Sequence, residues 1–219
     1  MKHSFLATGL LSLLLLTACN GGASAAQFQQ GLNYWQGKGV AKDPVKAVEL
    51  FTAAADAGNA DAQLTLGYLY MKGEGVEMNT DKATELFVKA AEQGGRDAQY
   101  NAGLSYVRGS GSSLNYPEAL KWFKLAAEQG DVGAMFNVGV MLANGEGAPA
   151  DLVGAYAWFT MAVEAGDTGA SESQKSVEHA LTSEQMQQAE TLLAQLREKV
   201  RRASPPASKP ALKMTTQPI

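Results

Sequence analysis

A period of 36 residues runs through most of this 219-residue chain and restricts the folds that it can adopt. Glycines recur at that spacing in two separate series, without insertion or deletion. The first series is Gly31, Gly67, Gly103 and Gly139, and the second is Gly58, Gly94, Gly130 and Gly166. A fixed period of roughly 20 to 50 residues is typical of stacked-repeat proteins, in which each unit buries its apolar face against its neighbours.

Each repeat predicts two helices. In the second repeat, Leu64, Tyr68 and Met71 have helical spacing, which indicates a first helix, helix A, over residues 61–72. A second helix, helix B, is expected to begin near residue 80, after a residue that favours the N-cap position. The N-cap residues of the four repeats are Asp43, Asn79, Asn115 and Asp151. Helix B then carries a face of bulky and small apolar residues, on which we expect Trp122 and Trp158 to be core residues rather than a ligand cage.

Gly67 falls in the middle of helix A, where glycine costs about 1 kcal/mol relative to alanine. Because that cost recurs in four repeats, we expect a packing reason. Gly67 and Ala62 would allow the paired helix to approach closely. Gly73 and Gly75 then end helix A with residues that adopt positive φ without strain.

The segments LGYLYMKGEGV and KATELFVKAAEQG carry the full pattern of one repeat. This pattern resembles the Sel1-like repeat, a relative of the tetratricopeptide repeat, over roughly residues 26–170. The resemblance implies an all-α fold, a right-handed α-solenoid of about four 36-residue helix hairpins with a C-terminal capping helix.

The amino terminus is different in kind. A short basic start is followed by the apolar run 5–16, which is too short for an ordinary membrane-spanning helix and is typical of a signal peptide. The run ends in Leu-Thr-Ala-Cys, which resembles a bacterial lipobox. The resemblance implies that residues 1–18 are removed and that Cys19 is lipidated and anchors the chain to a membrane; residues 19–25 are expected to form a flexible tether. An ordinary signal peptide with an incidental cysteine is the alternative.

Charge excludes one class of partner. Removal of residues 1–18 takes away Lys2 and no acid, so the chain becomes one unit more negative than its formal net charge of −4. We therefore expect no nucleic-acid partner. Since Cys19 is the only cysteine, its lipidation leaves no thiol for a disulfide or for catalysis.

The repeat pattern fails after Ala170, so the solenoid with its cap is expected to cover residues 26–203. Leu181, Thr182 and Gln185 predict a capping box for a last helix. Its apolar stripe would close the open end of the stack, and consists of Met186, Ala189, Leu193, Leu196 and Val200. Four basic residues near its end suit the helix dipole, with an anionic lipid or glycan site as the alternative. The proline-rich residues 204–219 are expected to be disordered.

The sequence gives no positive sign of catalysis. His179 is the only histidine after residue 18, and no Asp/Glu cluster has metal-ligand spacing, so we expect no metal and no cofactor. Some Sel1-like proteins have been described as β-lactamases, but this chain has neither their cysteines nor a Ser-x-x-Lys motif. We therefore predict that the protein is not an enzyme.

A polar stripe on helix A is the candidate binding surface, because helix A lines the concave face of tetratricopeptide-like stacks. Amide side chains there would bond the backbone of an extended peptide. The alternative is a helix face that is merely solvated. The candidate groove residues are Thr65, Lys72, Asn101, Ser105, Arg108, Asn137, Met141 and Asn144.

The function predicted from these features is a lipid-anchored scaffold that binds a protein or peptide in the bacterial envelope. Asn20 follows the lipidated position, which by resemblance to enterobacterial lipoproteins favours the periplasmic side of the outer membrane. Two alternatives remain. One is a module or hydrolase associated with peptidoglycan or polysaccharide, and the other is a secreted host-interacting virulence factor.

Overall fold

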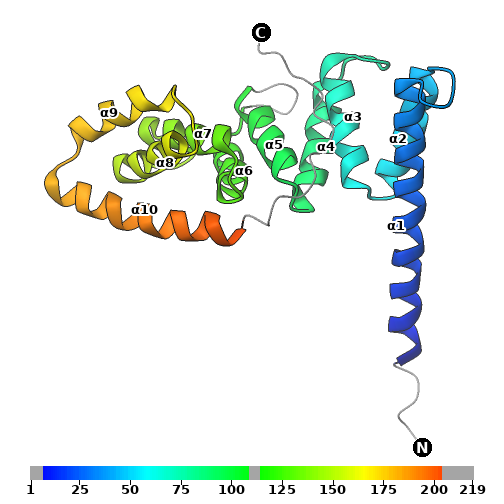
Figure 1. Ribbon diagram of the computed structural model, residues 1–219, viewed down its shortest axis with the longest axis horizontal. Coiled ribbons are helices and arrows are strands. Elements are labelled where there is room, and N and C mark those ends of the chain that lie inside the picture. The colour runs from blue at the N-terminus through cyan, green and yellow to red at the C-terminus, as the bar shows by residue number, and fades with distance from the viewer. Residues whose placement is uncertain (1–6, 109–113, 204–219) are drawn as a thin grey trace, which may run out of the picture. The chain divides into compact units, whose positions relative to one another are not determined.

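The computed structural model describes residues 7–108 and 114–203, in which all regular structure is helical (Figure 1). The chain divides into two compact units, residues 1–122 and 123–219, with the boundary inside one helix. Unit 1 contains α1 (Ala7–Gln36), α2 (Pro44–Asp56), α3 (Ala60–Lys72), α4 (Thr80–Glu92), α5 (Arg96–Arg108) and the first part of α6 (Tyr116–Glu128). Unit 2 contains the rest of α6, then α7 (Val132–Asn144), α8 (Leu152–Glu164), α9 (Ala170–Ala180) and α10 (Ser183–Ala203).

Consecutive helices pack as hairpins, as the repeat predicted. In unit 1, α1 packs on α2 and α3 on α4, and each helix B also packs on the next helix A. The odd-numbered helices α1 to α7 are therefore helices A, and the even-numbered helices α2 to α8 are helices B. The helix-B phenylalanines and alanines form the core, and Trp122 and Trp158 are also buried, which confirms the prediction that they are core residues.

The N-caps of the helices B are confirmed. The side chains of Asp43, Asn79 and Asp151 each accept a hydrogen bond from the backbone N–H three residues later. Asn115 does the same for Glu118, at 3.2 Å. Gly73 ends α3 with φ +70°, in the left-handed region, so that its N–H donates to the carbonyl of Leu69.

The glycine in the middle of helix A faces an aromatic ring. A Cβ placed on Gly67 would lie 2.5 Å from Cε1 of Phe87, and one on Gly139 would lie 2.6 Å from Cδ1 of Phe159. We expected the glycine to allow close approach of the paired helix. The group that packs against the glycine is the phenylalanine side chain of that helix. These rings are almost fully buried. A larger residue at the glycine position would therefore require a smaller one at the phenylalanine position.

The first helix is longer than the repeat required. Residues 19–25, expected as a flexible tether, lie inside α1, where Ala23 and Ala25 favour helix and Ser24 Oγ donates to the carbonyl of Gly21. In the part of the chain that the structure describes, no helix is long and apolar enough to cross a membrane. Residues 1–6 of the predicted signal peptide and the predicted disordered tail 204–219 lie outside the described residues.

Unit 2 is built around α8. Residues 154–162 of this helix are all buried, because α7, α9 and α10 all pack on it. The predicted capping box is present at the start of α10: Thr182 N–H donates to Gln185 Oε1, and Gln185 N–H donates to Thr182 Oγ1. Ala189, Leu193 and Leu196 are buried, so the predicted stripe does hold the capping helix.

Candidate functional site

Half-buried apolar residues gather on one side of each helix A. In α3 these are Leu64, Tyr68 and Met71, which pack against a buried cluster and keep part of their surface exposed. The equivalent residues of α1 and α5 have the same intermediate exposure. We call the nine residues of unit 1 the apolar stripe: Phe28, Leu32, Trp35, Leu64, Tyr68, Met71, Tyr100, Leu104 and Val107. In unit 2, α7 carries Phe136, Val140 and Ala143 at the same positions.

The predicted groove residues do not share one environment. Asn101 and Ser105, each 8% exposed, and Met141, 3% exposed, are buried. Thr65 and Asn137 are half-buried. The exposed ones are Lys72, Arg108 and Asn144, at the C-terminal ends of their helices. Five of the eight lie in unit 1, and Asn137, Met141 and Asn144 lie in unit 2.

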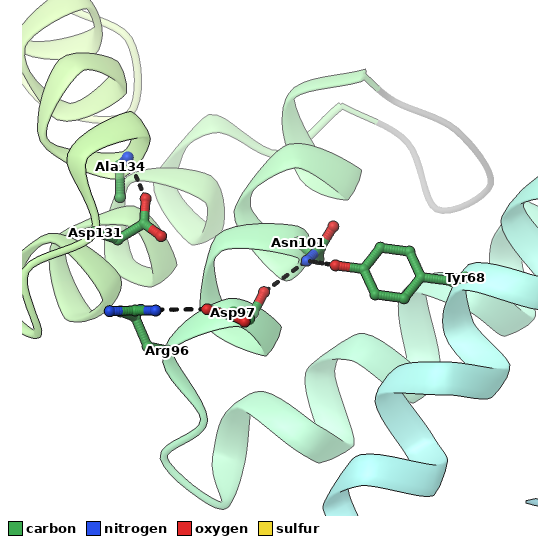
Figure 2. Close-up of polar contacts among 6 residues, drawn as sticks. All are labelled: Tyr68, Arg96, Asp97, Asn101, Asp131 and Ala134. Atoms are coloured by element: carbon green, nitrogen blue, oxygen red, sulfur yellow. Dashed lines mark hydrogen bonds and ion pairs between the residues drawn. The ribbon is translucent and has the colours of Figure 1, made fainter. Parts of the chain in front are cut away.

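Asn101 is bonded within the protein (Figure 2). Its Nδ2 donates to the hydroxyl of Tyr68 on α3 at 2.6 Å and to the backbone carbonyl of Asp97 at 2.6 Å. The side chain therefore joins two successive helices A. A buried hydrogen bond of this kind contributes about 0.5–1.5 kcal/mol to stability. Replacing Asn101 would thus perturb the fold as well as any bound peptide.

Charges border the apolar stripe at both ends of the helices. Asp61 and Asp97 lie in the first turns of α3 and α5, and Lys72 and Arg108 lie in the last turns. Lys72 Nζ is 3.7 Å from Glu74, a loose contact between exposed groups that contributes little. The exposed side of α3 and α5 is thus apolar in the middle and charged at its ends, whereas α1 has no charged residue in its first or last turn.

Two buried glutamines were not singled out from the sequence. Gln63 Nε2 donates to the carbonyl of Ala55 at 3.1 Å, and Gln99 Nε2 donates to that of Ala91 at 3.4 Å. Each bond adds a second donor to a carbonyl in the last turn of the preceding helix B, which also accepts from the N–H of Gly58 or Gly94. Gln93 also donates to Gln63 Oε1 at 2.8 Å. Gln63 and Gln99 are 36 residues apart, so the repeat period could have indicated that they share a structural role.

The basic end of α10 is paired with acids of unit 2. Arg197 binds Glu164 through two nitrogens, and Lys199 Nζ lies 2.6 Å from Glu128. Arg201 and Arg202 both bind Glu198. Arg197 and Lys199 thus hold α10 to α8 and α6, whereas Arg201 and Arg202 are paired within α10 itself. All four cations have acidic partners, which argues against the anionic-ligand alternative.

Contacts and burial move several pKa values, and each shift favours the form that the group already has at neutral pH. The hydrogen bond with Lys89 lowers the pKa of Glu85, and burial raises the pKa of Tyr156. The hydrogen bond with Tyr70 raises the pKa of Lys82, whose Nζ also lies 4.7 Å from the Tyr70 ring centroid. General acid–base catalysis needs a pKa near the working pH, and these groups move away from it.

No metal-binding group appears in the residues that the structure describes: no three or more His, Cys, Asp or Glu side chains lie together. His179 is exposed, and its Nδ1 lies 2.6 Å from the carbonyl of Lys175 on its own helix. A single imidazole held in this way has no second ligand beside it.

Comparison with known proteins assigns the chain to a family. The Sel1 repeat model matches residues 24–59, 60–95, 96–131 and 132–167. A Sel1 repeat protein from Oxalobacter formigenes is 38% identical, with a TM-score of 0.64, over 67% of this chain and 60% of that one. A protective antigen present in uropathogenic Escherichia coli strains, with an SLR fold, is 31% identical, with a TM-score of 0.53, over 89% of this chain and 50% of that one.

The chain thus spans about half to three fifths of the length of these two relatives of known structure. None of the curated proteins compared with it matches. The four matched repeats follow each other without a gap from residue 24 to residue 167, and each ends at a turn between helices B and A. The chain belongs to the Sel1 repeat family.

Proposed function

We propose that this protein is a non-enzymatic scaffold, anchored by lipid to the periplasmic side of a bacterial outer membrane, that binds a protein or peptide. Sel1 repeats generally mediate protein–protein interactions, and proteins built from them are usually non-catalytic scaffolds. The observation that supports binding most directly is the apolar stripe, which recurs on successive helices A and remains half exposed.

The chemistry of the stripe suits a partner with apolar side chains. Aromatic and methionine side chains such as Trp35, Tyr68 and Met71 provide large contact areas, and such residues are enriched where proteins bind each other. The exposed Lys72 and Arg108 at one end favour acidic groups on the partner. The contact surface proposed here differs from the polar groove predicted from the sequence, because Asn101 and Ser105 are buried.

Crosslinking in intact cells tests the binding surface. A photoreactive amino acid at Thr65, between two members of the apolar stripe on α3, is expected to capture a discrete partner. The same amino acid at Glu92, which is exposed at the end of α4, is the matched control in the same hairpin and is expected to capture none. Capture that is equal at the two positions, or stronger at Glu92, contradicts the assignment of the stripe.

The anchor rests on Cys19 and on the Leu-Thr-Ala sequence before it. Buried acyl chains contribute about 0.8 kcal/mol per CH₂ group, so the several chains of a lipidated cysteine hold a protein on a membrane durably. The glycan-associated, hydrolase and secreted-virulence alternatives remain predictions.

Cys19→Ala is expected to leave the chain uncleaved and absent from the outer-membrane fraction, because the sulfur that carries the lipid is gone. Fractionation and the size of the chain on a gel measure both effects. Membrane association at the normal processed size in this variant would rule out the lipid anchor.

A further inference from the structure

We propose that the lipid anchor holds unit 1 in a fixed orientation, with the turns between helices B and A facing the lipid surface and the loops between helices A and B facing away. The inference rests on the proposed lipidation of Cys19. It concerns a surface that no family resemblance assigns: the turn edge of unit 1, which includes Asp56, Gly58, Glu92 and Asp97.

The distance between the anchor and the turn edge is short. By the 36-residue register, Ser24 in α1 corresponds to Ala60, the first residue of α3. Ser24 therefore lies level with the turn edge, and Figure 1 shows α1 continuing beyond the turn between α2 and α3. Five residues of helix separate Ser24 from Cys19, which is about 7–8 Å at 1.5 Å per residue.

The connection is helical and joined to the core. Ser24 is only 3% exposed, and the Phe28 ring lies 5.6 Å from the Phe51 ring of α2, measured between centroids. One turn later, a Cβ on Gly31 would lie 2.6 Å from Phe51. Residues 19–23 are helical and continue without a break into this packed segment. We expect them to stay helical after residues 1–18 are removed, so that no flexible stretch separates the lipid from the first repeat. The anchor therefore fixes the orientation of unit 1 relative to the membrane and also attaches it.

The two edges of unit 1 expose different kinds of side chain: apolar ones at the loop edge and charged ones at the turn edge. In the described part of unit 1, the exposed large apolar residues all lie on the loop edge or the helix starts beside it: Val40, Val45, Met78 and Leu114. The turn edge presents Asp56, Glu92 and Asp97 to solvent. These side chains stay hydrated at headgroup level, so a position beside the lipid does not require any charge to be buried. The short helical connection to Cys19 is what places the turn edge there. Partners approach the apolar residues from the aqueous side.

The test measures which edge lies near the lipid. The full chain is isolated with its own lipid from bacterial membranes and placed in phosphatidylcholine vesicles that contain a lipid with a quencher on its headgroup. Lipidated Cys19 has no free thiol, so one introduced cysteine takes the fluorophore. Glu92→Cys places it at the turn edge and Met78→Cys at the loop edge, at opposite ends of α4, about 18 Å apart.

The label at position 92 is expected to be quenched at least twofold more than the label at position 78. A flexible insertion of about ten Gly and Ser residues after Gly22, which has no neighbouring atoms within 4 Å of a built Cβ, is expected to abolish the difference. Equal quenching without the insertion, or stronger quenching at position 78, overturns the fixed orientation while flotation with the vesicles still supports the anchor. A chain that does not float, or whose Cys19 takes the fluorophore, overturns the lipid anchor and the orientation together.

Discussion

Gly67→Leu is expected to lower the free energy of unfolding by about 2 kcal/mol, the upper end of the overpacking cost less the gain in helix propensity. Even the Cβ of the new side chain would lie 2.5 Å from Phe87, a distance at which atoms must move. The Phe87 side chain is fully buried, so its ring can move only against other core residues. Overpacking of a core costs about 1–3 kcal/mol and occasionally more, which exceeds the roughly 1 kcal/mol that leucine gains over glycine in helix propensity.

Gly22→Leu is the matched control, because Gly22 is also helical but has nothing within 4 Å of a built Cβ. There the propensity gain acts alone, so stability should stay the same or rise slightly. Urea unfolding followed by circular dichroism measures both variants. A Gly67→Leu protein as stable as the Gly22→Leu protein would show that no close contact exists at Gly67.

The local features of the fold were predictable from the sequence because they depend on residues close together in the chain. Asp43 and Asn79 cap their helices through the N–H groups three residues later, and Thr182 and Gln185 bond each other across one turn. The period of 36 residues gave the register of every hairpin. Hydrogen bonds between residues three positions apart can be predicted directly from the spacing of the residue types in the sequence.

The candidate surface was harder to predict, because it depends on which side of each helix A the neighbouring repeats cover. In the sequence, nothing distinguishes Asn101 from an exposed asparagine. In the structure, its side chain donates a hydrogen bond to the hydroxyl of Tyr68 from the preceding repeat. The spacing of Tyr68 and Met71 predicts a helix, but it does not tell how much of each side chain the neighbouring repeat covers. The structure shows that part of their surface remains exposed. Arg197 and Lys199 of α10 likewise bind partners 33 and 71 residues away in the chain.

The expected flexibility of residues 19–25 followed from their glycine and from resemblance to tethers. The segment also contains Ala23 and Ala25, which favour helix, and it lies directly before a packed helix that supplies a template for continuation. A helix that is already nucleated extends at little cost, whereas a free segment of this composition would have to nucleate alone. The same sequence therefore behaves differently once Phe28 and Gly31 are packed on Phe51.

Leu193→Ala is expected to lower the free energy of unfolding of unit 2 by about 2–5 kcal/mol, the range for truncating a buried leucine. Leu193 is 1% exposed in the stripe by which α10 covers α8. Residues 154–162 of α8 are buried on all sides only while α9 and α10 are in place, so loosening α10 exposes an apolar helix to water. We therefore expect a large effect from a helix that lies outside the four matched repeats.

Leu192→Ala is the matched control, since Leu192 is the same residue type, one position away on α10, and is only half-buried. Its truncation removes less buried surface and should cost less than half as much. Urea unfolding followed by tryptophan fluorescence measures both variants, and replacing Trp35 and Trp122 by Phe in both leaves Trp158, 4% exposed on α8, as the reporter of unit 2. Equal losses in the two variants would mean that α10 does not cover α8 through this stripe, and that the ion pairs of Arg197 and Lys199 hold the helix instead.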